Sequence, residues 1–201
     1  GGEIIRDIEP GEIITISRKG IRSDRSLCQE KRAHCIFEYI YFARNDSVMD
    51  GIEVNDARIN AGRALARQSK VEADIVVGVP ESGIAAAQGY ALESGIPYRV
   101  AFHKNSYIGR SFIKPTDEER RTAVHMKLSV LNNVVRDKRI VIIDDSIVRG
   151  TTMRQLIEML RKAGAREVHV RISSPPFLYP CYYGTDVPTA GQLIASKHSS
   201  D

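Results

Sequence analysis

Two adjacent acids, Asp144 and Asp145, follow a run of apolar residues and have the chemistry of a ligand site. The apolar run, 140–143, predicts a buried strand, and a stripe of apolar residues from Met153 predicts a helix after it. Open α/β sheets bind ligands where a strand leads through a short loop to a helix N-terminus. Because neighbouring strand residues point to opposite sides, both acids can reach one ligand only where the strand ends. The pair suits sugar hydroxyls or a metal ion.

The loop after the acids contains the groups that bind a phosphate. It offers backbone N–H groups, hydroxyl donors and a glycine that lets the backbone approach an anion. A second loop, 79–83, lies between another expected strand and helix; alone it would be a simple turn. Two such loops at one sheet edge suit a ligand with anionic groups at both ends. The candidate ligand-binding residues are Ser146, Ile147, Val148, Arg149, Gly150, Thr151 and Thr152 in the first loop and Glu81, Ser82 and Gly83 in the second.

The composition is that of an ordinary globular protein with a small basic excess. The 201 residues are 42% hydrophobic and 27% charged, with a net charge of +4, and can bury a normal core. The basic residues are scattered without aromatic interleaving, so an anionic small molecule explains the excess and no nucleic-acid partner is expected. No membrane partner is expected, because no apolar run approaches a membrane span. Three widely spaced cysteines argue against a secreted disulfide framework, which predicts a cytoplasmic protein.

Hydrophobic spacing predicts a separate N-terminal piece followed by alternating strands and helices. Residues 1–22 are expected to form a hairpin around the turn Glu9-Pro10-Gly11. Repeated strand–helix–strand units imply an α/β fold, with a parallel sheet covered by helices on both faces. The expected strands are 74–79, 98–102, 139–143 and 167–172, and the expected helices begin near 55, 83 and 153, the last ending at Gly164.

The polar interval 103–128 is too long for a tight joint in a compact α/β domain. A capping-box pattern at 116–119 predicts a helix inside it. The interval is either a surface excursion or a mobile flap that carries basic and aromatic residues onto a polyanion. The flap residues would be Lys104, Tyr107, Arg110 and Lys127.

The segment VIIDDSIVRGTT, 141–152, resembles the phosphoribosyl pyrophosphate motif of type I phosphoribosyltransferases. Four further segments, in the right order, resemble the glutamine phosphoribosylpyrophosphate amidotransferases (amidophosphoribosyltransferases). They are CIFEYIYFARNDS at 35–47, VPESG at 79–83, HKNSYIGRSFIKP at 103–115 and YYGTDVPTAGQLIA at 182–195. The resemblance covers almost the whole chain. It implies an open, mostly parallel twisted sheet with helices on both faces, a hood region and a small N-terminal β-hairpin.

The resemblance also implies roles for the candidate residues. Asp144 and Asp145 would hold the ribose hydroxyls and, with Ser82, place Mg²⁺; residues 146–152 would cradle the 5′-phosphate, and the 81–83 loop would meet the pyrophosphate. The four flap residues would close over the pyrophosphate as catalytic groups. The implied reaction replaces the pyrophosphate of phosphoribosyl pyrophosphate with an amine, which commits purine nucleotide synthesis. Two alternatives are a non-catalytic regulator that senses phosphoribosyl pyrophosphate and a salvage nucleobase phosphoribosyltransferase.

The family has parts that this sequence does not contain. Residues 1–34 resemble only the closing strands and linker of its N-terminal glutaminase domain, and 35–201 would form a C-terminally truncated phosphoribosyltransferase domain. Glutamine would therefore supply the amine only through the missing glutaminase domain, and the chain alone would use free ammonia. Purine nucleotides as feedback inhibitors and a homotetramer are also implied. Cys35 and Cys181 match two ligands of the [4Fe–4S] cluster in one branch of the family; with three cysteines in all, no cluster is expected in this chain.

Overall fold

The computed structural model describes residues 3–28, 33–105, 128–185, 187 and 189–196. The chain divides into two compact units, Gly1–Ile36 and Phe37–Asp201. None of the helices in the described segments is long and apolar enough to cross a membrane. The candidate ligand-binding residues all belong to the second unit, whereas Tyr107, Arg110, Lys127 and the helix expected at 116–119 lie outside the described residues.

The first unit contains one antiparallel hairpin. Strand β1 (Ile13–Ser17) pairs with β2 (Gly20–Asp24). The prediction of a hairpin around Glu9-Pro10-Gly11 is wrong in its position, because the residues before this turn form no strand. The turn itself forms, with the Glu12 N–H donating to the Glu9 carbonyl at 2.9 Å. Gly11 lies so close to the Leu27 carbonyl that the turn packs against the residues after β2.

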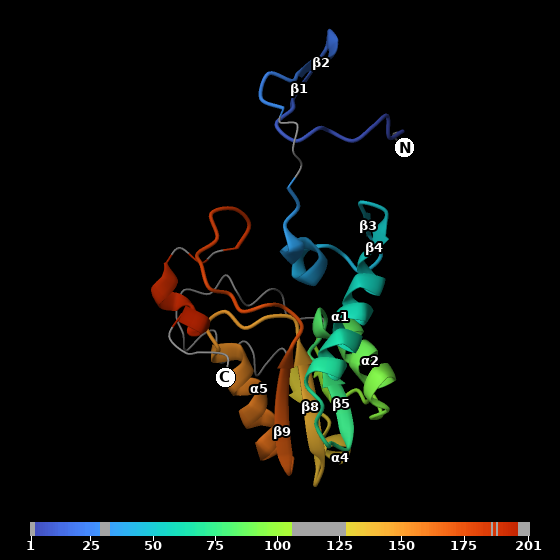
Figure 1. The fold of residues 1–201 in the computed structure, drawn as a ribbon, viewed down its shortest axis with the longest axis vertical. Coiled ribbons are helices and arrows are strands. Elements are labelled where there is room, and N and C mark those ends of the chain that lie inside the picture. The colour runs from blue at the N-terminus through green and yellow to red at the C-terminus, as the bar shows by residue number, and fades with distance from the viewer. Residues whose placement is uncertain (1–2, 29–32, 106–127, 186, 188, 197–201) are drawn as a thin grey trace. The chain divides into compact units, whose positions relative to one another are not determined.

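The second unit is built on the parallel sheet that the strand–helix pattern predicts, with strand order β5-β8-β9. Helices α1 and α2 cover one face of this sheet and α5 covers the other (Figure 1). The prediction of an α/β fold with helices on both faces is confirmed. The elements of the sheet and its helices are α1 (Val54–Gln68), β5 (Ile75–Gly78), α2 (Gly83–Ser94), β8 (Arg139–Asp144), α5 (Thr151–Lys162) and β9 (Glu167–Ile172).

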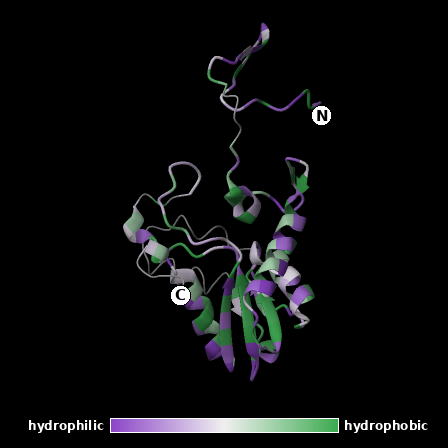
Figure 2. Ribbon diagram, viewed as in Figure 1, coloured by the Kyte–Doolittle hydropathy of each residue, from purple (hydrophilic) through white to green (hydrophobic). Residues whose placement is uncertain are grey.

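Alternating residues of the central strand supply both cores. Ile140 and Ile142 of β8 pack with Leu156 and Leu160 on the α5 side. Val141 and Ile143 pack with residues of the α1–α2 side. All four strand residues are fully buried, and Figure 2 shows β5 and β8 as hydrophobic strands. A strand buried on both faces reads as a continuous apolar run, which is why 140–143 shows no polar alternation.

Helices α1 and α2 are pressed together at two glycines. A Cβ on Gly62 would lie 1.9 Å from the Ala86 carbonyl oxygen, and one on Gly89 would lie 2.0 Å from that of Ile59. Only glycine permits backbones to approach this closely. The contact holds the start of α2, and with it the 79–82 loop, in place beside the sheet.

The expected strand at 98–102 is wrong. Tyr98 makes only an isolated parallel bridge to Val76, in which the Val76 N–H donates to the Pro97 carbonyl and the Arg99 N–H donates to the Val76 carbonyl. Val100, beyond the bridge, is exposed, and no ladder continues to it. The strand that forms begins at Phe102, where a buried side chain anchors it. Strand β6 (Phe102–Lys104) pairs antiparallel with β7 (Leu128–Val130), so the two ends of the predicted flap are brought together.

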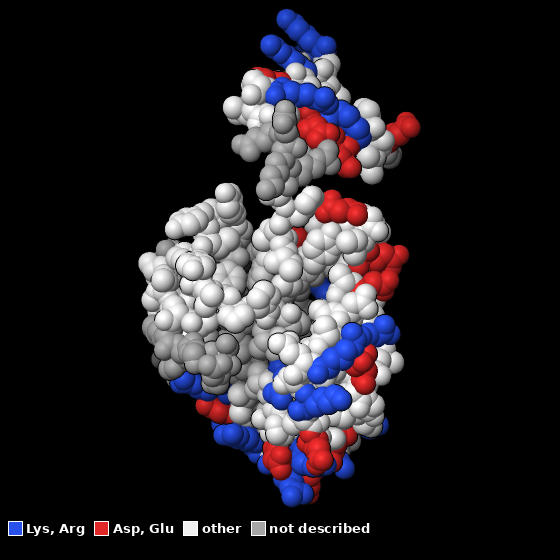
Figure 3. Space-filling view, viewed as in Figure 1, with Lys and Arg blue, Asp and Glu red and all other residues white. Residues whose placement is uncertain are grey.

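Short elements surround this framework. Before α1 come the short π-helix η1 (Glu38–Phe42) and strands β3 (Val48–Met49) and β4 (Ile52–Glu53). Helix α4 (Asn132–Val135) precedes β8, and the short helical turns η3 (Ala190–Gln192) and η4 (Ile194–Ser196) lie near the C-terminus. On the face drawn in Figure 3, the Lys and Arg side chains of the described residues are interspersed with Asp and Glu. Helix α5 ends as expected, with Gly164 at a φ of +92° just beyond it.

Candidate active site

The carboxyl ends of β5 and β8 lie side by side. The parallel register pairs Gly78 with Ile143, and the Val79 N–H donates to the Ile143 carbonyl at 2.9 Å. The loops that leave these two strands therefore start next to each other. Gly83, the first residue of α2, is so close to β8 that a Cβ on it would lie 2.6 Å from the Ile143 oxygen and 3.2 Å from the Asp144 Cα. The two predicted ligand loops thus share one edge of the sheet.

Asp144 and Asp145 are buried at this edge, with 9% and 5% of their surface exposed. Asp145 accepts hydrogen bonds from the hydroxyls of Ser82 and Ser146. Asp144 Oδ1 accepts one from the Asp145 N–H at 3.0 Å. Ser82 stands at the N-cap position of α2 but does not cap the helix, since its hydroxyl is used on Asp145. The diacid and the 79–83 loop, 63 residues apart in sequence, form one cluster as the sequence predicts.

The surroundings of the two carboxyl groups disfavour their ionised forms. Burial, and then the neighbouring Asp145 carboxylate, raise the pKa of Asp144 to about 8. Burial also raises the pKa of Asp145, against the opposing effects of the hydrogen bonds from Ser146 and Ser82 and of the Arg58 charge. Two carboxylates this close cannot both ionise without a compensating positive charge or hydrogen-bond donors.

A divalent cation fits this donor set. Mg²⁺ prefers oxygen ligands and is usually held by one or two carboxylates together with water and substrate phosphates. Within the described residues no group of three His, Cys, Asp or Glu side chains could hold a metal by itself. Two carboxylates suit a cation whose other ligands are oxygens of a bound substrate or water.

Arg58 of α1 is a part of the site that the sequence reasoning missed. It is 94% buried, and its guanidinium donates to the carbonyls of Tyr39 and Ala43, at 2.7 and 2.9 Å, and to the Asn45 side chain. Its charge acts on Asp145. One side chain thus connects the 39–45 segment to the diacid. Arg58 falls on the face of α1 that packs against the domain, and a charged residue on that face is the sequence signal that could have identified it.

The 146–150 loop ends at the N-terminus of α5. Gly150 occupies the N-cap position with a φ of +77°, and no side chain caps the helix. Thr151 and Thr152 form the first turn of α5. The Ile147 side chain packs against the core, so only its backbone can serve a ligand. Arg149 Nη2 donates to Gln192 Oε1 at 2.7 Å. This uncapped N-terminus is a site where an anion is favoured.

Lys104 is the one predicted flap residue that the structure describes. It lies at the end of β6, and its Nζ is 2.9 Å from Glu81 Oε1. The structure thus joins a predicted catalytic lysine to the predicted pyrophosphate loop. The side chains are 32% and 69% exposed, so the pair is accessible to a competing anion.

The cysteines do not provide a cluster site within this chain. Cys28, Cys35 and Cys181 are all free thiols. Cys35 belongs to the first unit and Cys181 to the second. Because a [4Fe–4S] cluster takes four thiolates and the sequence has three, the residues present do not fit one. A cluster in a longer parent protein stays a prediction.

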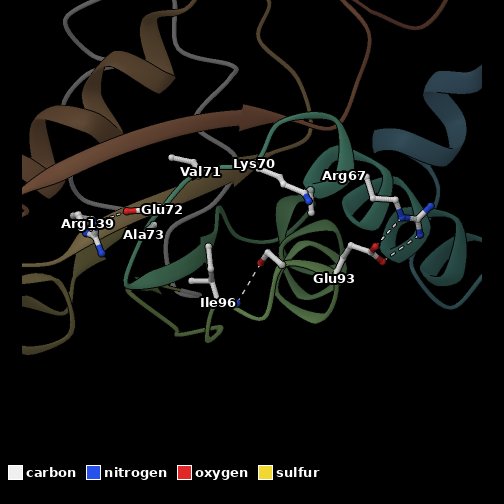
Figure 4. Close-up of a pocket in the computed structure, with 10 residues that line it drawn as sticks. Arg67, Lys70, Val71, Glu72, Ala73, Glu93, Ile96 and Arg139 are labelled. Carbon is white, nitrogen blue, oxygen red and sulfur yellow. Dashed lines mark hydrogen bonds and ion pairs between the residues drawn. The ribbon is translucent and has the colours of Figure 1, made fainter.

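A separate cavity of about 640 Å³ lies where β8 begins, at the amino end of the sheet (Figure 4). Arg67 and Glu93 pair across it at 2.8 Å, and Arg139 lies 3.6 Å from Glu72. None of the predicted ligand-binding residues lines this cavity. It is a surface hollow bordered by exposed ion pairs, and the chemistry described above belongs to the opposite edge.

Comparisons with known proteins agree with this geometry. The family model described as "Phosphoribosyl transferase domain" matches residues 49–173. The amidophosphoribosyltransferase of Bacillus subtilis (strain 168) is 53% identical over 199 residues, 99% of this chain and 42% of the relative. That of Archaeoglobus fulgidus is 52% identical over 99% of this chain and 44% of the relative. The chain thus spans less than half the length of these curated relatives.

Almost the whole of this chain matches the fold of a solved relative. The structure of glutamine phosphoribosylpyrophosphate amidotransferase from B. subtilis, complexed with ADP and GMP, superposes with a TM-score of 0.81 at 54% identity. The match covers 97% of this chain and 43% of the other. With the family model covering more than half of the sequence and this fold in common, the chain belongs to the phosphoribosyl transferase domain family.

Proposed function

We propose that this chain is the phosphoribosyltransferase part of an amidophosphoribosyltransferase. The reaction transfers an amine to C1 of phosphoribosyl pyrophosphate and yields 5-phosphoribosylamine and pyrophosphate, the first committed step of purine nucleotide synthesis. The observation that carries the proposal is the buried pair Asp144 and Asp145, bonded through Ser82 to the neighbouring loop at the carboxyl edge of the sheet. Relatives more than 50% identical over almost the whole chain bear this enzyme's name.

Asp144 and Asp145 accept hydrogen bonds from the ribose hydroxyls in this proposal. Acceptor-only carboxylates suit hydroxyl donors and are unsuited to phosphate oxygens. Loss of pyrophosphate from C1 builds positive charge on the ribose, and a nearby carboxylate pair stabilises that charge. Asp144 and Asp145, with Ser82 nearby, would hold Mg²⁺, which would supply positive charge to the leaving pyrophosphate. A bound cation would also offset the burial that raises the pKa of both acids and, for Asp144, the effect of the neighbouring carboxylate.

The two loops hold the two ends of the substrate. Residues 146–152 bind the 5′-phosphate through backbone N–H groups, the hydroxyls and the uncapped N-terminus of α5. The 81–83 loop meets the pyrophosphate, and Lys104 moves from Glu81 onto it. Tyr107, Arg110 and Lys127 are proposed to join Lys104 in closing over the pyrophosphate, which excludes water from the reactive sugar. Catalysis of this kind depends on positioning and electrostatics, so it requires no protein nucleophile.

The amine source and the assembly are proposed from the relatives, of which this chain spans less than half the length. We propose that residues 1–34 continue a glutaminase domain that supplies ammonia from glutamine, that residues 35–201 form the phosphoribosyltransferase domain, and that the isolated chain uses free ammonia. Purine nucleotides are proposed as inhibitors, since the solved B. subtilis relative was complexed with ADP and GMP. A homotetramer in the cytoplasm completes the proposal; free thiols suit a reducing compartment.

Pyrophosphate release tests the proposal directly. The chain is mixed with phosphoribosyl pyrophosphate, Mg²⁺ and ammonium, and pyrophosphate is measured. We expect release that depends on ammonium and is absent in the Asp144→Asn/Asp145→Asn double variant. Turnover with adenine or hypoxanthine in place of ammonium would favour a salvage transferase. Binding of phosphoribosyl pyrophosphate without turnover would favour a sensing regulator, and an absence of binding by the folded chain would contradict the proposal.

A further inference from the structure

Residues 190–196, which we name the strap, lie directly on the predicted phosphate loop. The Ile194 N–H donates to the Val148 carbonyl at 2.9 Å. Arg149 Nη2 donates to Gln192 Oε1 at 2.7 Å. A Cβ on Gly150 would lie 2.8 Å from Ile194 Cδ1. Three consecutive residues of the loop are thus contacted by a segment that lies more than 40 residues further along the chain.

The strap is itself anchored. Leu193, between the two residues that contact the loop, is fully buried. Ser196 Oγ donates to the carbonyls of Leu193 and Ala190, both at 2.8 Å, which closes the strap on itself. Leu193 lies between the short helical turns η3 and η4, and its burial joins both turns to the domain. The strap can therefore act as a fixed support.

The loop benefits from such a support. Residues 146–149 belong to no helix or strand, and Gly150 takes a left-handed conformation before α5 begins. A cradle of backbone N–H groups binds an anion well only when its shape is held before the ligand arrives. The Arg149 side chain is restrained in the same way, because its hydrogen bond to Gln192 limits the rotamers that it can adopt.

We propose that Gln192 is a positioning residue for the 5′-phosphate end of the substrate. It acts through Arg149 and, with the Ile194–Val148 bond, keeps the 146–150 loop in its anion-binding shape. This inference rests on the function proposed above and extends it to a residue outside the loop. The pyrophosphate end is held by other elements, at 81–83 and Lys104, so it does not depend on the strap.

Binding of the two ends can be measured separately. Isothermal titration calorimetry would use ribose 5-phosphate and pyrophosphate, each with Mg²⁺, and kcat and KM would be measured with phosphoribosyl pyrophosphate and ammonium. Gln192→Ala removes the side chain, and Gln192→Met keeps its bulk without the acceptor. Gln68→Ala, at an exposed position at the end of α1, is the matched control.

We expect both Gln192 variants to bind ribose 5-phosphate about 3- to 10-fold more weakly, which is the size of roughly one ordinary hydrogen bond. KM for phosphoribosyl pyrophosphate should rise by a similar factor, while kcat, the affinity for pyrophosphate and the melting temperature stay as in the parent and the Gln68→Ala control.

Three results would overturn the inference. They are an unchanged affinity for ribose 5-phosphate, an equal loss for pyrophosphate, which would indicate a general structural role, and a loss in Gln192→Ala that Gln192→Met restores, which would indicate packing. If the parent chain binds neither ribose 5-phosphate nor phosphoribosyl pyrophosphate, the proposed function fails instead.

Discussion

Replacing Asp144 with asparagine should stabilise the ligand-free protein while it abolishes binding of the sugar phosphate. Asp144 is 91% buried beside a second acid, and burial together with the Asp145 carboxylate raises its pKa from 3.8 to about 8. Asparagine has nearly the same shape and keeps an oxygen that can accept the Asp145 N–H. The variant therefore removes the electrostatic cost of the site with little change in packing.

The size of the effect follows from the pKa. At pH 7 the unfolded chain has given up the proton of Asp144, whereas the folded chain keeps most of it. One pKa unit corresponds to about 1.36 kcal/mol. Since pH 7 lies roughly three units above the unfolded pKa and below the folded one, the cost to the folded state at pH 7 is at most about 4 kcal/mol. Because the folded pKa is the higher one, this cost is absent below about pH 4 and grows as the pH rises toward 8.

Denaturant unfolding at pH 5 and at pH 8, with EDTA present to remove divalent cations, measures the effect. The free energy of unfolding of Asp144→Asn should exceed that of the parent, and by more at pH 8 than at pH 5. Asp56→Asn, at an exposed position in the first turn of α1, should change it by less than about 0.5 kcal/mol at either pH. A variant that is less stable than the parent at pH 8, or a difference that does not grow with pH, would refute the reasoning.

Three further substitutions probe the surroundings of the diacid. Gly83→Ala places a Cβ against the Ile143 carbonyl and should cost about 1–3 kcal/mol in unfolding experiments and weaken pyrophosphate binding; normal binding would contradict the close approach of α2. Glu81→Gln breaks the exposed pair with Lys104, so it should leave stability within about 1 kcal/mol and tighten pyrophosphate binding roughly 2- to 5-fold in calorimetry, an effect that salt should reduce. Arg58→Lys keeps the charge but cannot satisfy all three acceptors, and should lower the free energy of unfolding by about 2–4 kcal/mol; an unchanged value would show that the fork is dispensable.

The local sequence alone determined the central unit of the fold. The four apolar residues at 140–143, the acids after them and the stripe on α5 predict a strand, a loop and a helix, all of which form. Strand β9 forms over the whole of the expected range. These predictions succeed because a strand buried on both faces and an amphipathic helix leave a periodic signal in consecutive residues.

Only the tertiary structure decided how distant residues meet. The bonds from Ser82 to Asp145, from Arg58 to the 39–45 segment and from Arg149 to Gln192 join residues whose separation in sequence carries no signal. The errors have a similar cause. The N-terminal hairpin and the strand after Pro97 depend on which backbone groups find partners, and that depends on the packing of the whole unit. The sequence identified the acids, but the fold decided that they are buried and what holds them.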